Sequence, residues 1–501
     1  MQLPLSSAST RKSFGLMFGI WFTLWFAIHQ YGILNLWWAA DDYSCWDKSI
    51  RQLWDGGLYH GRPLCGMLYW LYHITPPDEF GIGFLTIKFL QGALHALAGA
   101  LVTLGLTRHF NLKIALLATA PFQIWAFHYE TTLWWAGSMY PVAAILSLGG
   151  VLLAIKAVED NSWKLALPAA IFCGLSVLSN QAAGITGLVL WVLLSSLRLG
   201  KNEVTVKTLF LEALNIGGGY LLGSILSITL MTLNHYPRFE SATSISERFN
   251  FWKQMITRLW FHQPFFSPAL LTSNLLLFGS IFVGVIIQAI TSSQKNPFKR
   301  GIPLIAFILI WFLPFLSSLV ISSPFISARI LYAGPLIITA GIAISALIEP
   351  KKIRTLILTA ITITTLASTV FNGWTARDIA QDCVYTYNRD IETLHEIESV
   401  AQQNGATRVL FLRFGEAKAM NLNPYGGKYP VPFNPNLSIM LNEWWNYRFL
   451  KYYATTVENV DWWHWDDLRK KYQHLGTKLP RTPSIAIYYA PEDNIVIVIP
   501  R

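Results

Sequence analysis

Long runs of apolar residues dominate this chain and limit what it can fold into. A helix needs roughly 20 consecutive, mostly apolar residues to cross the hydrocarbon layer of a membrane. Eleven runs approach or reach that length, at residues 13–36, 82–106, 111–128, 139–157, 164–179, 182–198, 209–233, 270–291, 302–322, 327–348 and 353–374. We therefore expect a mainly α-helical, polytopic membrane protein with about 11 transmembrane helices.

The composition agrees with a membrane protein. Only 13% of the 501 residues are charged, whereas soluble proteins carry about 25%. The net charge of +10 comes from short basic clusters between the apolar runs, such as Lys295-Lys299-Arg300 and Lys351-Lys352-Arg354. This distribution is typical of cytoplasmic anchors and excludes an extended nucleic-acid-binding face. The first run is too long for a signal-peptide core, so we expect it to stay as the first span.

The basic clusters also predict the orientation. With a cytoplasmic N-terminus, the cytoplasmic connections and their flanks hold these clusters, whereas the opposite connections at 129–138, 180–181 and 323–326 contain no Lys or Arg. The positive-inside rule favours this arrangement. An odd number of spans then places the C-terminal region outside a bacterial inner membrane.

Three outward segments are long. They are a first loop at 37–81, with a helix expected near 63–74, a second loop at 234–269, and the C-terminal region. We expect two domains, a transmembrane domain at 1–374 and an outward α/β module at 375–501. The module should contain a helix at 388–404 and strands at 408–414, 485–489 and 495–499. Gly217-Gly218-Gly219 lies within a span and should serve close helix packing.

The most informative polar feature is Asp41-Asp42, directly after the first span. Carboxylates are costly at membrane depth and less so at its boundary. Two acids in an aromatic-rich loop at that boundary can face both a lipid-borne substrate and water. The alternative is a helix N-cap for residues 44–55. Spacing alone does not decide between these interpretations.

The stretch from Asp41 to Leu64 resembles the first-loop signature of the GT-C superfamily. It is similar in particular to the serotype-converting O-antigen glucosyltransferases of bacteria and phages, which modify lipopolysaccharide in the cell envelope. The matching residues are Asp41-Asp42, Trp54 and Gly61-Arg62-Pro63-Leu64. The resemblance covers roughly 25 residues, and the layout of many spans with an outward C-terminal region is similar as well. The C-terminal region is larger here than in the simplest members.

The resemblance implies an inverting glycosyltransferase. Its donor would be a polyprenyl phosphate sugar carrying glucose or another hexose, and its acceptor a hydroxyl on an extracytoplasmic glycan or lipid. One of Asp41 and Asp42 would act as the general base, and their roles are not separable from sequence. Glu130 would be a further acid in the catalytic pocket, or else a polar interfacial residue. No cofactor is required by this chemistry, although some GT-C enzymes use a divalent cation, and no cluster here has zinc spacing.

The departing phosphate needs positive charge. Arg62 is the first candidate and Arg329 the second, because Arg329 begins a span at the outer face where the positive-inside rule gives it no reason to be. Interfacial anchoring is the alternative for both. Arg258 in the second outward loop is a weaker candidate, since charged loops are usually only solvated. The side chains expected to contact substrate are Tyr43, Trp54, His60, Asn180 and Gln181.

Other interpretations remain open at this stage. Asn180 and Gln181 are equally explained by a tight turn between two spans. Lys88 can snorkel outward, and His95 should be a packed, hydrogen-bonded core residue. The tryptophan-rich stretch 443–465 can stack on sugars or lie at the membrane interface, and Cys45 can pair with Cys65 or stay free. A flippase for lipid-linked sugars and a non-catalytic envelope scaffold are the competing functions, and we find neither the internal repeat nor the clearly broken charged helices of a transporter.

Overall fold

The computed structural model describes most of the chain, and the structural statements below concern that part. The described residues are 8–37, 45–46, 48–74, 81–125, 128, 131, 137–235, 244, 246, 249–250, 253, 267–294, 296–314, 332–412, 446–460, 462–478 and 485–500.

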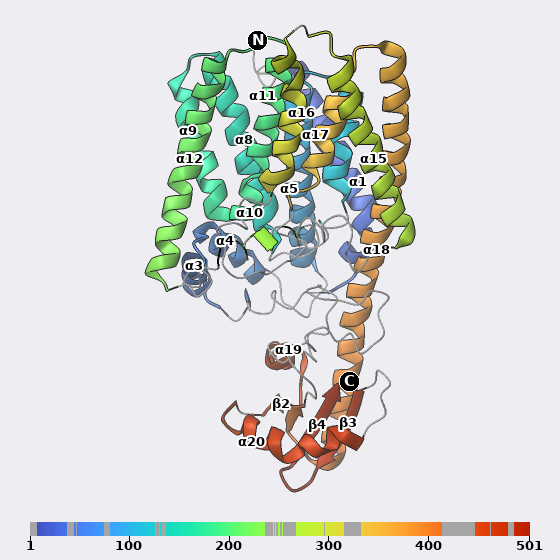
Figure 1. Cartoon of the computed structure of the whole chain (residues 1–501). Coiled ribbons are helices and arrows are strands. Elements are labelled where there is room, and N and C mark those ends of the chain that lie inside the picture. Colours follow the sequence, from blue (N-terminus) through green and yellow to red (C-terminus); the bar gives the residue numbers. More distant parts are fainter. Residues whose placement is uncertain are drawn as a thin grey trace. The chain divides into compact units, whose positions relative to one another are not determined.

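Every run expected to span the membrane contains a helix (Figure 1). Among the described residues, seven helical stretches are long and apolar enough to cross a membrane. The predicted class, a mainly helical multi-pass membrane protein, is confirmed. The helices are α1 (Ala8–Ile33), α5 (Ile82–Leu106), α6 (Leu112–Ile124), α8 (Met139–Glu159), α9 (Trp163–Ser179), α10 (Gln181–Gly184) with α11 (Thr186–Gly200), α12 (Val206–Leu233), α15 (Pro268–Thr291), α16 (Pro297–Phe312), α17 (Leu336–Ser345) and α18 (Lys351–Asn404).

Polar residues directly before the apolar runs begin several of these helices. The Asn111 side chain accepts a hydrogen bond from the Ile114 backbone nitrogen at 3.1 Å at the start of α6. Thr205 and Ser267 cap α12 and α15 in the same way. Each cap satisfies one of the backbone N–H groups that the first turn of a helix leaves without a partner. The helices therefore begin close to the residues where the sequence predicts them.

Helix α18 differs from the expectation of two separate helices at 353–374 and 388–404. The structure has one continuous helix of 54 residues. No glycine or proline lies between Trp374 and Asn404, so no residue that commonly interrupts a helix is present there. Gly405, with a φ of +68°, follows the last helical residue, and a left-handed glycine is the usual end of a helix.

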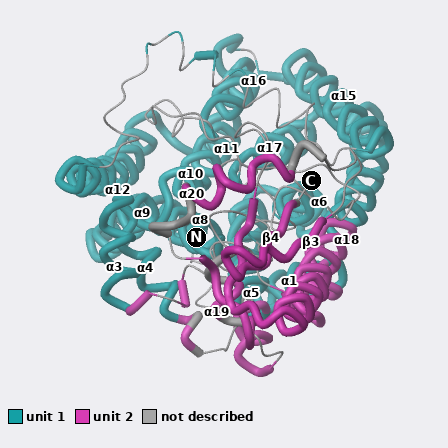
Figure 2. The backbone as a smooth tube through the Cα atoms, turned by 90° about the horizontal axis from the view of Figure 1, so that it is seen from below, with its two compact units in different colours: residues 1–28, 50–70, 89–376 teal, residues 29–49, 71–88, 377–501 magenta. Residues whose placement is uncertain are grey.

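The chain forms two compact units (Figure 2). Unit 1 comprises Met1–Ile28, Ile50–Trp70 and Phe89–Ala376, and unit 2 comprises His29–Ser49, Leu71–Lys88 and Arg377–Arg501. Helices α1, α5 and α18 each contribute residues to both units. The domain boundary near residue 375 stays a prediction.

Unit 2 contains a four-stranded sheet. The strands are β1 (Arg408–Phe411), β2 (Glu458–Asn459), β3 (Ile485–Ala490) and β4 (Ile495–Pro500), in the order β2-β1-β4-β3. β1 pairs in parallel with β2 and β4, and β3 pairs antiparallel with β4. Isoleucines of β4 and leucines of the β1 segment pack with Tyr472 of α20 (Trp462–Tyr472). The three strands expected from the sequence are confirmed. The remaining elements of this region are α19 (Asn446–Tyr453) and the 3-10 helix Gln473–Lys478.

Helices α9 and α12 of unit 1 pack closely through glycines. A Cβ atom at Gly219 would lie 2.3 Å from the backbone oxygen of Ala170, and one at Gly223 would lie 2.5 Å from another α9 backbone oxygen. A Cβ at Gly217 or Gly218 would meet no atom within 4 Å. Of the three consecutive glycines expected to serve helix packing, Gly219 alone does so.

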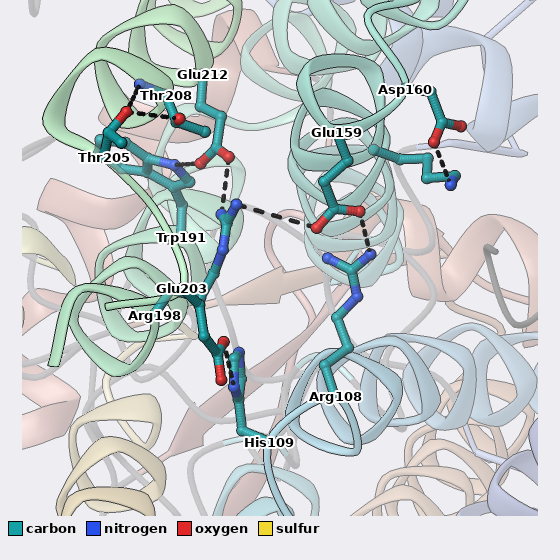
Figure 3. Close-up of polar contacts among 11 residues, drawn as sticks. Arg108, His109, Glu159, Asp160, Trp191, Arg198, Glu203, Thr205, Thr208 and Glu212 are labelled. Atoms are coloured by element: carbon teal, nitrogen blue, oxygen red, sulfur yellow. Dashed lines mark hydrogen bonds and ion pairs between the residues drawn. The ribbon is translucent and has the colours of Figure 1, made fainter. Parts of the chain in front are cut away.

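The basic connections after α5, α8 and α11 gather at one end of unit 1, which we call the basic end (Figure 3). Arg198 pairs with Glu212 at 2.7 Å, and their side chains are 5% and 0% exposed. The Trp191 indole donates to the second Glu212 oxygen at 3.0 Å. Arg198 also lies 4.0 Å from Glu159, which pairs with Arg108 at 2.9 Å. The network links the ends of α8, α11 and α12 to the connection between α5 and α6.

The glycine packing makes a prediction with an internal control. Replacing Gly219 with Ala should push α12 away from α9 and lower the thermal unfolding temperature of the purified protein in detergent. Gly218→Ala meets no neighbour and removes a flexible residue from a helix, so it should be neutral or stabilise by up to about 1 kcal/mol. An equal effect of the two substitutions would contradict this packing.

The charge network makes a second prediction. Glu212→Gln leaves the buried Arg198 beside a neutral amide, and removing one partner of a buried pair typically costs about 3–5 kcal/mol. Glu203→Gln is the control, because the Glu203 side chain is 46% exposed and lies 3.6 Å from His109. Burial, aided by Lys201, Arg198 and Arg108, lowers the pKa of His109 to about 4, so His109 is neutral at pH 7. The control should cost less than about 1 kcal/mol, and equal losses in thermal unfolding would refute the assignment.

Candidate functional site

Several residues expected to form the site lie outside the described part of the chain. They are Asp41, Asp42, Tyr43, Glu130, Arg258 and Arg329. Their roles stay predictions. The structure describes the expected residues Trp54, His60, Arg62, Asn180 and Gln181.

The described site residues of unit 1 lie far from the basic end. Helix α8 begins at Met139, whose sulfur is 3.0 Å from the Cys65 sulfur, and ends at Glu159 in the charge network. A helix of 21 residues at 1.5 Å per residue is about 32 Å long, close to the roughly 30 Å thickness of the hydrocarbon layer. We call this opposite end of unit 1, which holds α3 and α4, the α4 end (Figure 1).

A tight pair of short helices presents Arg62 at the α4 end. Helix α3 (Ile50–Tyr59) packs against α4 (Pro63–Tyr69), and a Cβ at Gly66 would lie 2.4 Å from the Leu53 backbone oxygen. Gly61 has a φ of +65°, which side chains other than hydrogen rarely tolerate. Pro63 occupies the first turn of α4, where its missing N–H costs nothing. Arg62 is therefore fixed between a left-handed glycine and a proline. The helical segment expected at 63–74 is confirmed as α4 followed by a 3-10 turn at Trp70–Ile74.

A closed ring of hydrogen bonds joins Arg62 to two transmembrane segments. Arg62 Nε donates to Gln181 Oε1 at 2.5 Å, and Gln181 Nε2 donates to Ser227 Oγ at 2.8 Å. The Ser227 hydroxyl then donates to the Gly61 carbonyl at 2.9 Å, which belongs to the peptide bond that precedes Arg62. The ring connects the loop between α3 and α4 with the start of α10 and the last turns of α12.

The charge of the Arg62 guanidinium is not neutralised within this ring. Its side-chain partner is the neutral Gln181 amide, and among the described residues no acceptor contacts the two terminal nitrogens. Arg198 at the basic end pairs instead with two carboxylates. The two arginines thus differ in whether described carboxylates pair with their charge, although both lie at the ends of transmembrane helices.

Asn180 and Cys65 complete the described surroundings of Arg62. Helix α9 ends at Ser179, and the buried Asn180 accepts a hydrogen bond from the Ala183 backbone nitrogen at 3.0 Å to begin α10. The turn expected at these residues is confirmed. The Cys65 thiol donates to the Ser179 carbonyl at 2.9 Å, and burial raises the pKa of this thiol to about 12. Cys65 is therefore a protonated structural donor. Cys45 and Cys65 are not joined by a disulfide.

A buried aromatic cluster in unit 1 contains His128 and Tyr332, which lie close in sequence to the predicted site residues Glu130 and Arg329. His95 on α5 contacts Tyr332 Oη through Nδ1 at 2.9 Å and the Gln123 carbonyl through Nε2 at 3.1 Å. Because a carbonyl can only accept, Nε2 carries the proton, and the Tyr332 hydroxyl donates to Nδ1. His128 Nε2 in turn donates to the Tyr332 carbonyl at 3.0 Å, and the two rings stack at 4.6 Å. His95 is a packed, hydrogen-bonded core residue, as predicted.

Lys88 differs from the expectation that it snorkels to the membrane surface. Its side chain is fully buried in unit 2. The ammonium lies 4.1 Å from the centre of the Trp37 ring and 5.2 Å from that of Phe84. Cation–π contacts of this kind stabilise a desolvated lysine. Trp37 is the last described residue before Asp41-Asp42, so Lys88 contacts the described end of the first outward loop.

Two further predicted residues lie near the α3–α4 turn. Trp54 on α3 is 38% exposed, and the exposed His60 ring meets the Tyr59 ring edge-on at 5.1 Å. Neither side chain has a described contact with Arg62, Gln181 or Ser227. Among the residues that the structure describes, no group of three or more His, Cys, Asp or Glu side chains is placed to hold a metal ion. In the tryptophan-rich stretch, Trp444 and Trp445 lie outside the described residues, and α20 covers its end.

No protein-family model matches the chain, and no curated protein matches its sequence. Among solved structures, the crystal structure of ArnT from Cupriavidus metallidurans bound to undecaprenyl phosphate is similar, with a TM-score of 0.42 and 11% sequence identity over 97% of each chain. A TM-score of this size does not establish a common fold. The proposals below therefore rest on the residues of this chain.

The geometry of the α3–α4 turn predicts a strong effect at Gly61. Gly61→Ala combines a left-handed backbone with a Cβ 2.6 Å from the Ser227 backbone oxygen, so the turn must shift and α12 with it. We expect a loss of more than about 1 kcal/mol, seen as a lower thermal unfolding temperature. Gly56→Ala in α3 meets no atom within 4 Å and should be neutral or stabilising. A Gly61 variant as stable as the Gly56 variant would contradict the described turn.

Proposed function

We propose that this chain is a GT-C-type membrane glycosyltransferase that uses a polyprenyl phosphate sugar as donor. It transfers one sugar, a hexose such as glucose, to a hydroxyl of an extracytoplasmic glycan or lipid-linked acceptor. In this proposal the basic end faces the cytoplasm of a bacterium and the α4 end faces the outside of its inner membrane. The sequence resemblance in the first outward loop suggests the reaction, and the Arg62 site supports it.

The proposal depends on one observation: the described side-chain partner of the Arg62 guanidinium is neutral. An arginine whose described partner is a neutral amide keeps its positive charge available at the α4 end. The terminal nitrogens of a guanidinium form a planar fork that matches two oxygens of one phosphate group. The head group of a polyprenyl phosphate sugar is a single phosphodiester at the membrane surface, and it becomes a phosphate monoester when the sugar leaves. Arg62 is therefore the proposed donor-phosphate ligand.

The acidic pair supplies the base in this scheme. The acceptor oxygen attacks the anomeric carbon, and the bond between that carbon and the phosphate oxygen breaks with inversion. Asp41 or Asp42 takes the proton of the acceptor hydroxyl late in the transition state. The polyprenyl phosphate leaves as an anion, and Arg62 stabilises its developing charge. The second aspartate orients the acceptor or raises the proton affinity of the first.

Glu130 and Arg329 are proposed to join the same pocket. Thr131, next to Glu130, donates a hydrogen bond to the His128 carbonyl at 2.9 Å, and His128 contacts Tyr332, which follows Arg329 by three residues. Two residues extend at most about 7 Å of chain and three about 11 Å, so both segments leave one buried cluster. Arg329 would be the second phosphate ligand and Glu130 the additional acid.

The remaining predicted residues keep supporting roles in the proposal. Tyr43, Trp54 and His60 are placed in or beside the first loop and would contact the sugar or the acceptor. Arg258 in the second outward loop would add to the positive field around the phosphate. The chemistry requires no cofactor, since Arg62 and Arg329 provide the charge that a divalent cation would otherwise supply.

The proposal predicts that the acidic pair is essential for transfer. Asp41→Asn and Asp42→Asn should be assayed in membranes supplied with a polyprenyl phosphate sugar and an acceptor glycan. Loss of the general base should lower the transfer rate about 10²–10⁴-fold. Asp55→Asn is the control, because Asp55 lies in the same loop, its side chain is 61% exposed, and it faces Arg51 at 3.9 Å.

The control should transfer sugar at the parent rate. If both single variants and the double variant also transfer at that rate, with normal protein levels in the membrane, the enzymatic assignment is wrong. A flippase or a scaffold would then be the better explanation.

A further inference from the structure

We propose that Gln181 and Ser227 are positioning residues that hold Arg62 so that its terminal nitrogens face one phosphate monoester. This inference rests on the proposed function and gives Gln181 a role different from sugar binding. Both ends of the Gln181 amide are occupied, Oε1 by Arg62 and Nε2 by Ser227. A side chain whose polar atoms already have partners makes a poor direct ligand, but it can fix the orientation of its neighbour.

The direction of each hydrogen bond fixes the orientation of the guanidinium. The Gly61 carbonyl can only accept, so the Ser227 hydroxyl donates to it, and the remaining lone pairs of Ser227 accept from Gln181 Nε2. The amide oxygen of Gln181 must then face Arg62, where it accepts from Nε. The alternative amide orientation would place two donors against each other. Ser227 therefore determines that the oxygen of the Gln181 amide, and not its nitrogen, faces Arg62.

The engaged edge decides what Arg62 can bind. With Nε used by Gln181, the guanidinium cannot offer its Nε–Nη edge to an anion. It offers the two terminal nitrogens instead, which are spaced to take two oxygens of a single phosphate. The Nε–Nη edge of the guanidinium is then not available to a second phosphate group.

The hydrogen-bonded ring that includes Arg62 is anchored on packed helices of unit 1. Gln181 is the first residue of the four-residue helix α10, and Ser227 lies on α12 against the Gly61 backbone. Both belong to elements that pack on α8 and α9, so the ring ties Arg62 to the rigid part of unit 1. Arginine side chains lose considerable rotamer freedom on ordering. A side chain ordered before the donor arrives binds it more tightly.

The test compares substitutions whose ranking by donor affinity depends on the role of Gln181. Purified full-length protein in lipid nanodiscs would be titrated with a polyprenyl monophosphate, and KM and kcat for the polyprenyl phosphate sugar would be measured in parallel. Gln181→Met removes both hydrogen bonds, and we expect Kd and KM to rise roughly 10-fold and kcat to fall as well, because a misplaced Arg62 also stabilises the leaving phosphate less. Ser227→Ala should raise both roughly 3-fold.

Gln181→Glu separates positioning from simple structural support. A glutamate keeps an acceptor for Arg62 Nε and forms a stronger contact with it, but it neutralises the charge that the phosphate needs. Our inference predicts that Gln181→Glu binds the monophosphate more weakly than Gln181→Met, while its thermal unfolding temperature stays near that of the parent. If the ring served only stability, the glutamate variant would bind the donor better than the methionine variant.

Tyr220→Phe is the matched structural control. Tyr220 lies on α12 and donates to the Gly184 carbonyl of α10 at 2.8 Å without contacting Arg62. Its loss should lower thermal stability and leave the donor KM unchanged.

An unchanged Kd in Gln181→Met and Ser227→Ala would overturn the positioning role. If Asp41→Asn still abolished transfer in that case, the proposed enzyme would stand without this inference. If the parent protein showed no sugar transfer and no preference for the monophosphate over the neutral polyprenol, the proposed function would fail as well.

Discussion

A polar group inside a helical membrane bundle must find its partner within the protein, because the lipid offers none. This constraint shapes both ends of unit 1. At the basic end, Glu212 is fully buried and is satisfied by Arg198 and Trp191. At the α4 end, the backbone at Gly61 and the side chains of Gln181 and Ser227 satisfy one another in a closed ring. The bundle is held at each end by a different kind of polar contact.

The difference lies in the partner that each arginine receives. Arg198 is paired with carboxylates, so its charge is used within the protein and contributes to the fold. Arg62 is held by a neutral amide, so its position is fixed while no described residue neutralises its charge. Keeping an uncompensated charge partly buried is costly. This cost is offset in the proposed function, where an anionic head group binds to Arg62.

Sequence reasoning predicted the fold better than the site. The spans were predictable because twenty apolar residues have few alternatives to a membrane helix, and the strands of unit 2 because their isoleucine and valine runs are bounded by a turn. The continuity of α18 was missed because no single residue marks it; it follows from the absence of glycine and proline. The burial of Lys88 was missed as well, since its contact with Trp37 joins two residues that are 51 positions apart.

Arg62, Asn180 and Gln181 were each singled out, but their proximity depends on the packing of α4 against α9. Ser227 carried no sequence signal at all, because a serine in an apolar run usually bonds its own helix.

The proposed function requires that Arg62 at the α4 end keeps its positive charge for one phosphate group. The most direct measurement compares the affinity of the parent protein and of Arg62→Gln for a polyprenyl monophosphate and for the matching neutral polyprenol. The account predicts that the parent prefers the monophosphate and that this preference disappears in Arg62→Gln, while the affinity for the polyprenol is unchanged. An equal preference for the monophosphate in both proteins would contradict it.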